Sequence, residues 1–267
     1  MDALKVFDAY SLRARLFPAI ITAAPALAAL ILLISWKSFE LSNATATLAI
    51  VVLLFAIADF ARERGRGVER RLFANHQGMP SIVMFRRSDA TIDSGSKERY
   101  RLFLASKLGR RAPSAEQESA DQGAADTFYE QCGVWLRQNT RDTKKFTLLF
   151  TENVTYGFRR NLLGVKWLAL GLNALVVGIC VVLLWRISWV LETDQGKRIC
   201  VVLLVAAAHA AYMLVAVRAS AVWDAGRGYG RELILSCEAF LTAPLPPKKA
   251  ARAGRDREDR AAKSSPE

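Results

Sequence analysis

The residues best suited to metal binding or nucleophilic catalysis are few in this chain, and their spacing keeps them apart. His76 and His209 are the only histidines, and the four cysteines show no metal-type spacing. The sequence contains no HExxH, GxSxG or phosphate-loop pattern. Asp89, Asp93 and Glu98 have the spacing of helix caps and solvated helix ends rather than of a catalytic cluster. We therefore expect no enzyme, no bound metal and no organic cofactor.

Residues 151–166 combine tyrosine, arginine and asparagine directly before an apolar stretch. Within them, four residues are candidates for coupling a signal in the preceding region to the helix that follows: Tyr156, Arg159, Arg160 and Asn161. The alternative is an interfacial anchor, because basic residues attract anionic headgroups by about 1 kcal/mol each near the surface. Basicity alone does not require the aromatic and amide residues, so both interpretations stay open.

A line of glycines begins in the same segment. Gly157, Gly164, Gly171 and Gly178 recur every seven residues, which on one continuous helix predicts a single, slowly drifting stripe. Small residues let helices approach closely in lipid, and a seven-residue repeat favours a shallow, left-handed crossing. The expected partner is the alanine-rich stretch around Ala207, or the same helix of a second subunit.

Four polar residues interrupt the apolar stretches: Thr22, Asn173, His209 and Tyr212. Counted from the expected cytoplasmic end at 1.5 Å per residue, His209 would lie about 12 Å deep and Asn173 about 9 Å deep. An ionisable residue inside a membrane is a functional candidate by default, so this layer is a candidate for wetting a pore or responding to protonation. The alternative is a neutral histidine, hydrogen-bonded to one neighbour, that joins two helices.

The elements that must position these residues are four apolar stretches, arranged as two close pairs around a charged insert. They cover about residues 17–36, 44–60, 167–189 and 199–217. Each approaches the ~20 residues that a helix needs to cross the hydrocarbon core, and a helix satisfies its own backbone polar groups in lipid. The sequence therefore predicts an all-α integral membrane protein with two transmembrane helical hairpins, the first within residues 1–60 and the second within 167–217.

Basic residues predict the orientation of these hairpins. Of the 37 Lys and Arg residues, only Lys37, Arg186, Lys197 and Arg198 fall on the side of the two short links. Because Lys and Arg accumulate on the cytoplasmic side, we expect the insert and both termini in the cytoplasm. The first stretch is interpreted as an uncleaved anchor, since its apolar residues continue past a small-residue segment.

The insert, residues 61–166, holds 20 Lys and Arg against 12 Asp and Glu, most of the net charge of +12. It is long enough for one small domain, with a core that is small or shared with extended membrane helices. We expect this domain to be mainly helical. The predicted elements are a short strand at 81–87, helices at about 96–108 and 115–139, the latter behind a capping box at Ser114 and Gln117, and a helix from about 142 into the third stretch.

The chain after the fourth stretch divides in two. Residues 218–242 form a cytoplasmic segment in which Gly226, Gly228 and Gly230 precede an amphipathic helix at 232–241. Residues 243–267 are rich in charged residues and proline, which predicts a disordered tail.

The basic insert predicts anionic partners. Anionic headgroups of the bilayer, a nucleotide signal and a cytoplasmic protein each suit its charge. Nucleic acid fits less well, because the aromatic residues are not interleaved with the basic ones in a known binding motif. The glycine line also favours a homo-oligomer.

Two segments carry a resemblance: the one that starts ADTFY at Ala125 and runs to Arg141, and ENVTYGFRRNLLG from Glu152. With the paired stretches, they resemble uncharacterised bacterial four-helix membrane proteins over most of the chain. In layout the chain is similar to membrane effectors of anti-phage systems, which couple a cytoplasmic sensing module to spans that assemble and perturb the membrane. The resemblance implies a multi-pass protein of the bacterial inner membrane whose cytoplasmic domain controls its spans. A scaffold for a soluble partner, or a transporter or channel component, are the alternatives, because layout does not fix function.

Overall fold

The computed structural model describes residues 10–33 and 43–242, and every element in these ranges is a helix. The predicted all-α class is therefore confirmed for the described part of the chain. In chain order, the elements are η2 (Ser11–Leu16), α1 (Phe17–Leu33), α2 (Asn43–Asn75), α3 (Pro80–Phe85), α4 (Ser94–Leu108), α5 (Ala115–Ala120), α6 (Gln122–Asn139), α7 (Thr147–Gly164), α8 (Lys166–Arg186), α9 (Asp194–Val215), α10 (Ala219–Leu235) and α11 (Cys237–Leu241). The predicted tail, 243–267, and the end of the first predicted stretch, 34–36, lie outside the described residues.

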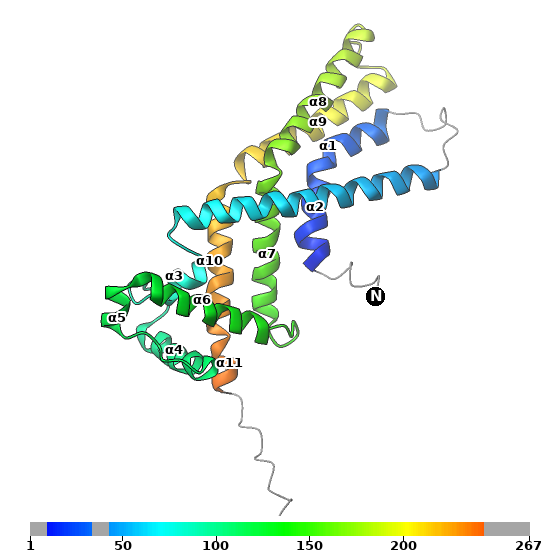
Figure 1. The fold of residues 1–267 in the computed structure, drawn as a ribbon. Coiled ribbons are helices and arrows are strands. Elements are labelled where there is room, and N and C mark those ends of the chain that lie inside the picture. Colours follow the sequence, from blue (N-terminus) through cyan, green and yellow to red (C-terminus); the bar gives the residue numbers. More distant parts are fainter. Residues whose placement is uncertain (1–9, 34–42, 243–267) are drawn as a thin grey trace, which may run out of the picture.

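Within the part of the chain that the structure describes, three helical segments are long and apolar enough to cross a membrane: Ser11–Leu33, Lys166–Arg186 and Asp194–Val215. They correspond to the first, third and fourth predicted stretches, with ends shifted by a few residues. In Figure 1, α1, α8 and α9 extend together from one end of the molecule, and the ribbon of α1, which contains Pro25, changes direction along its length. A small buried cluster that includes Val176, Cys180 and Ile199 joins α8 and α9 and packs against α1.

The second predicted stretch, residues 44–60, forms most of the first half of α2. The helix continues without a break to Asn75, so one element carries both the apolar stretch and the basic run behind it. Leu48, Val52 and Leu53 are largely exposed on its apolar half. α2 crosses α7 and packs on η2 and α1 rather than running along α8 and α9 (Figure 1). A fourth crossing by this half of α2 stays a prediction.

A helical domain occupies the other end of the molecule, and two separate segments of the chain build it. Its core takes Phe85, Tyr129 and Leu136 from the insert, and Leu233 and Ile234 from α10, all fully buried. α10 runs beside α7 and ends among α4, α6 and α11 (Figure 1). The core is therefore shared between the insert and the long helices that lead to and from the bundle of candidate spans, α1, α8 and α9.

Local capping signals in the insert are confirmed. α4 begins after Asp93, whose carboxylate accepts a hydrogen bond of 2.8 Å from Ser96 N. α5 begins with the predicted capping box, in which Ser114 Oγ accepts from Gln117 N at 3.2 Å while Gln117 Oε1 accepts from Ser114 N at 2.9 Å. These helices thus begin where the oxygen of a short polar side chain accepts a hydrogen bond from a free backbone N–H of the first turn.

Two expectations about the insert are wrong. The predicted strand at 81–87 is the helix α3, because Pro80 at its first position pre-sets the helical φ. A short apolar run fits a strand or a buried helix equally well, and here it buries Met84 and Phe85. The predicted helix at 115–139 is divided at Asp121, which leaves the helical conformation and caps α6 by accepting from Ala124 N at 2.9 Å.

The three alternating glycines lie inside α10 rather than ahead of a helix. A Cβ at Gly230 would lie 2.9 Å from Ser81 N, and one at Gly226 would lie 3.3 Å from the Tyr156 ring. The missing side chains therefore let α10 pack closely on α3 and α7. The helix expected at 232–241 is divided at Ser236 between α10 and α11.

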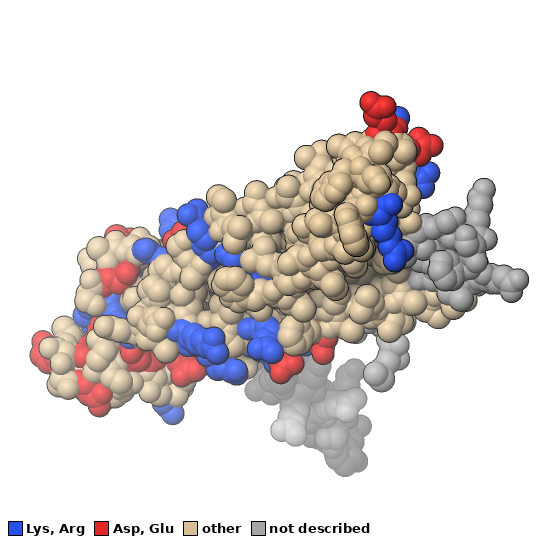
Figure 2. Space-filling model, turned by 90° about the horizontal axis from the view of Figure 1, so that it is seen from above, with Lys and Arg blue, Asp and Glu red and all other residues tan. Residues whose placement is uncertain are grey.

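Charged residues are unevenly distributed over the surface. Seen from above, a broad uncharged surface covers the end formed by α1, α8 and α9, whereas charges of both signs gather over the helical domain (Figure 2). At the far tip, the segment between α8 and α9 carries Glu192 and the beginning of α9 carries Asp194 and Lys197. This distribution is typical of a protein with one end in lipid and the other in water.

Candidate functional site

The junction between α7 and α8 connects the helical domain to a candidate membrane span. Val165 interrupts the helix there, with φ −106° and ψ 6° and a fully buried side chain. On the next residue, Lys166 Nζ donates to Val217 O at 2.9 Å and so ties the start of α8 to the segment that follows α9. α7 itself packs on α2, η2 and α10. A shift of α7 therefore has a direct structural route to α8.

Tyr156 is the one aromatic residue among the four predicted coupling residues. Its buried ring stacks on Tyr229 of α10, with 6.1 Å between ring centroids, and on Phe73 of α2, with 6.5 Å. Burial raises the pKa of its hydroxyl, and the Glu69 carboxylate raises it further. Among the described residues this hydroxyl finds no hydrogen-bond partner. The three stacked rings join α10, α7 and α2 into one unit.

Arg160 forms an ion pair with Glu69 of α2. Its guanidinium also lies over the Tyr156 ring, 5.5 Å from the centroid. Burial lowers the pKa of Arg160, but the adjacent Glu69 carboxylate outweighs this, so the net pKa is raised and the charge is held. Only 13% of the Arg160 side chain and 26% of the Glu69 side chain are exposed. Loss of either partner would leave a poorly solvated charge, which makes the pair sensitive to substitution.

Asn161 and Arg159 reach two further elements. Asn161 is buried, and its Nδ2 donates to Ala14 O of η2 at 2.7 Å. The exposed Arg159 donates from Nη1 to Ala221 O of α10 at 3.0 Å. The structure thus brings all four predicted residues to one junction, at which the last turns of α7 contact α2, η2 and α10.

The predicted glycine stripe is divided by the helix break at Val165. A Cβ at Gly157 would lie 3.0 Å from the hydroxyl of Tyr10, just before η2, and one at Gly164 would lie 2.5 Å from Gly65 N in α2. These two glycines therefore pack against the N-terminal helix and α2 rather than against the alanine-rich α9. Gly171 and Gly178 have open space around them in the part of the chain that the structure describes.

The four polar residues that the sequence predicts inside the membrane do not form one layer. Asn173 Nδ2 lies 2.8 Å from both Ala206 O and His209 Nδ1, which makes a buried pair between α8 and α9. Thr22 donates to Pro18 O of its own helix at 2.8 Å. Tyr212 is 40% exposed and lines a cavity with Phe158 and Arg159 of α7. Within the described ranges, His209 Nε2 is buried and has no hydrogen-bond partner. The Asn173–His209 geometry corresponds to the interpretation of a histidine that joins two helices.

His76, Cys132 and Cys237 are packed against other residues rather than grouped into a reactive site. His76 Nδ1 lies 2.9 Å from Leu72 O, and its ring stacks on Trp223 with 3.8 Å between centroids. Cys132 and Cys237 lie in the core of the helical domain, and burial raises the pKa of the Cys132 thiol to about 12. A thiol that stays protonated at neutral pH is a poor nucleophile.

A buried polar network in the helical domain escaped the sequence analysis. Lys97 and Arg101 are almost fully buried on α4. Lys97 Nζ donates to Arg86 O at 2.7 Å and to Asp89 O, and Arg101 Nη2 donates to Phe85 O. Burial lowers the pKa of Lys97, as does the positive charge of Arg101. These two side chains fix the segment between α3 and α4, and their four-residue spacing on one helix face was the available signal.

Comparison of the chain with protein-family models, with curated proteins and with solved structures finds no match. The site residues are therefore interpreted from their own contacts, and the resemblance to bacterial four-helix membrane proteins stays a prediction.

Proposed function

We propose that this chain is a non-enzymatic inner-membrane protein whose cytoplasmic helical domain receives a signal or a partner and controls the arrangement of its membrane helices. The output would be assembly of the spans and perturbation of the membrane, as in an effector of anti-phage defence. The proposal includes a fourth crossing by the apolar half of α2 and both termini in the cytoplasm, which the distribution of Lys and Arg favours.

The observation that carries the proposal is the convergence of Tyr156, Arg159, Arg160 and Asn161 on one junction. Each side chain contacts an element other than α7, and the next residues of the chain open the candidate span α8. Passive anchoring requires only an apolar helix of sufficient length. A junction with a partly buried ion pair and a buried amide suits an element with a defined position that a signal can change.

The exposed face of α8 supports assembly as the output. Gly171 and Gly178 have open space, and Leu168, Leu175 and Val182 of the same face are exposed. Small residues allow close packing of helices in lipid. We therefore expect Gly171→Leu to lower the mass of the detergent-extracted particle, with Gly67→Leu in α2, where no atom lies within 4 Å of the Cβ position, as the matched control.

The functional test is membrane potential in bacteria that express the full chain, reported by a voltage-sensitive dye. Wild type is expected to depolarise the cells on strong induction, and Asn161→Leu to abolish this at an equal level of membrane-inserted protein. Asn139→Leu, at an exposed asparagine of α6, is the control. If wild type never depolarises cells under any inducer level or phage challenge, and Gly171→Leu changes only expression, the effector function is wrong.

A further inference from the structure

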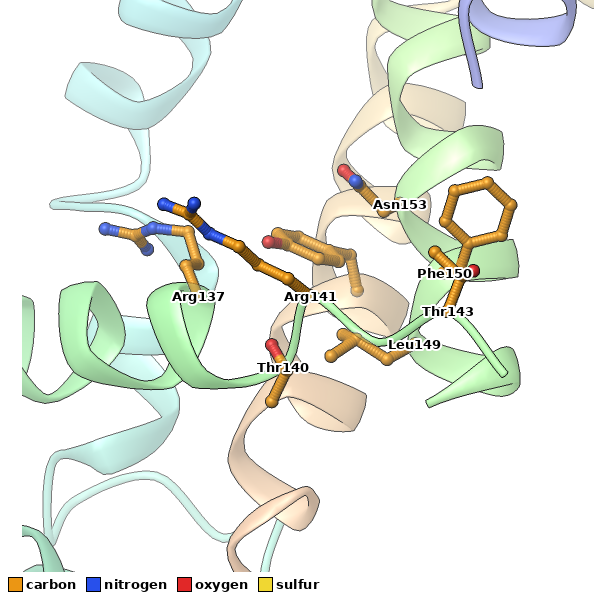
Figure 3. Close-up of a pocket in the computed structure, with 8 residues that line it drawn as sticks. Arg137, Thr140, Arg141, Thr143, Leu149, Phe150 and Asn153 are labelled. Atoms are coloured by element: carbon orange, nitrogen blue, oxygen red, sulfur yellow. The ribbon is translucent and has the colours of Figure 1, made fainter. Parts of the chain in front are cut away.

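A cavity opens on the helical domain where the turn between α6 and α7 meets α7 and α10. Its volume is about 320 Å³. The lining residues that matter here are Arg137, Thr140, Arg141, Phe150, Asn153 and Tyr229 (Figure 3). A volume of this size is at the lower end of the range for small-molecule sites and fits a ligand the size of a mononucleotide.

Two arginines give the cavity its charge. Arg137 lies in the last turn of α6, and Arg141 follows four residues later. In Figure 3 their guanidinium groups extend in the same direction. Within the described ranges, neither forms an ion pair, and the one side-chain hydrogen bond of Arg137 is a weak one of 3.9 Å to Met79 Sδ. Elsewhere in the domain, Arg86 and Arg87 are both paired with carboxylates. Two adjacent, unpaired guanidinium groups are suited to bidentate binding of a phosphate.

The rest of the lining supplies a neutral hydrogen-bonding group and aromatic walls. The Asn153 amide lines the cavity and has no hydrogen-bond partner among the described residues. Tyr229 also lines the cavity and is largely buried. Phe150 lies at the opposite side from the arginines (Figure 3). Aromatic faces bind planar bases by stacking, and a free amide can read the edge of a base. The cavity thus combines the groups that a phosphate and a planar ring require.

A lipid headgroup is a poor alternative occupant because of the position along α7. Asn153 lies 13 residues before Lys166, where the candidate span begins, and at 1.5 Å per residue this is about 20 Å. With α1, α8 and α9 as the spans, α7 leads away from their bundle (Figure 1), and headgroups of a flat bilayer do not extend so far from the hydrocarbon core. A soluble anion reaches the cavity without that restriction.

We propose that this cavity binds a soluble, phosphate-bearing nucleotide, with Arg137 and Arg141 on the phosphate and Asn153 and Tyr229 at the base. The binding of a nucleotide in this cavity does not depend on the proposed function, whereas its effect on the membrane helices rests on that function. The consequence would follow from the stack of Tyr229 on Tyr156, which places a wall of the cavity in contact with the junction between α7 and α2.

The test is isothermal titration of the full-length protein in detergent with AMP and GMP, and separately with inorganic phosphate and adenosine. We expect one nucleotide to bind, and Arg141→Gln to weaken its affinity about tenfold or more, since a charge-assisted hydrogen bond is lost. Arg110→Gln, at an exposed arginine outside the cavity, is expected to change the affinity less than twofold. Circular dichroism should show equal helix content in all three proteins.

Three outcomes would overturn the proposal: no binding of either nucleotide at millimolar concentration, equal affinity for inorganic phosphate and the nucleotide, or equal loss in both arginine variants. Binding to phosphatidylglycerol nanodiscs that depends on Arg141, without nucleotide binding, would also overturn it in favour of a lipid site. The two proposals fail separately. Nucleotide binding without depolarisation contradicts the proposed function only, and depolarisation that survives without nucleotide binding contradicts the cavity only.

Discussion

Replacing Gly164 by alanine should weaken the crossing of α2 and α7. The new Cβ would lie 2.5 Å from Gly65 N and 2.8 Å from Arg64 C, and both are backbone atoms that cannot rotate away. Ordinary contacts are about 3.5 Å, so the two helices must separate by about 1 Å. Overpacking of this kind costs about 1–3 kcal/mol.

Alanine recovers about 1 kcal/mol because it favours a helix more than glycine does. The net loss is therefore roughly 1 kcal/mol, which lowers the unfolding midpoint by about 2–4 °C for a chain of this size. The assay is thermal unfolding of the detergent-solubilised protein, followed by circular dichroism at a fixed scan rate. Gly171→Ala in α8 is the matched control, since no atom lies within 4 Å of its Cβ position. Equal midpoints for Gly164→Ala and Gly171→Ala would refute the close crossing.

Three further predictions concern the helical domain and the membrane bundle. Burial raises the pKa of the Glu118 carboxyl, but the hydrogen bonds that it accepts outweigh this and hold its net pKa below the ordinary 4.5. Its contribution to stability is therefore present above pH 4.5 and lost as the pH falls through the folded-state pKa, and Glu118→Gln should flatten the acid limb of the pH–stability curve. Asp93→Ala should lower the midpoint of thermal unfolding, because Ser96 N loses its capping acceptor. Asn173→Leu should destabilise the detergent-solubilised bundle by about 0.5–1.5 kcal/mol through loss of its bond to His209; a pH-dependent ion flux abolished by the same change would contradict this structural role.

Features encoded by a short stretch of chain could be predicted from the sequence. The three candidate spans follow from the length of their apolar runs. Asp93 and Ser114 identify the starts of α4 and α5, because their side chains bind backbone groups three residues away. The coupling residues combine tyrosine and asparagine with arginine, which an anchor to anionic headgroups does not require. In the structure they converge on one junction.

Features that depend on distant partners could not be predicted. Gly164 packs on Gly65, almost a hundred residues away, and no local pattern identifies that partner. The seven-residue glycine repeat assumed an unbroken helix, whereas Val165 is held outside the helical conformation in a fully buried position. The cavity was missed because Tyr229 and Arg141 meet only when α10 returns from the membrane bundle to the helical domain.

That return of α10 decides how the scaffold alternative has to be tested. A scaffold predicts that residues 61–166 keep their partner when fused to an unrelated membrane anchor. However, Leu233 and Ile234 of α10 are fully buried in the core of this domain, and each such side chain contributes about 1.5–3 kcal/mol by burial. The insert alone should therefore fail to fold, whichever function is correct.

A transplant that also carries residues 218–242 restores these side chains and makes the comparison informative. If the folded two-segment domain captures the same partner from any anchor and the full chain leaves the membrane potential unchanged, the spans are passive and the scaffold is correct. If the transplant binds its partner or nucleotide but depolarises cells only when α7 continues into its own α8, the junction at Tyr156 to Asn161 is the coupling element. The second result is the one we expect, because α7 and α10 enter the same core while their neighbours, α8 and α9, form one bundle.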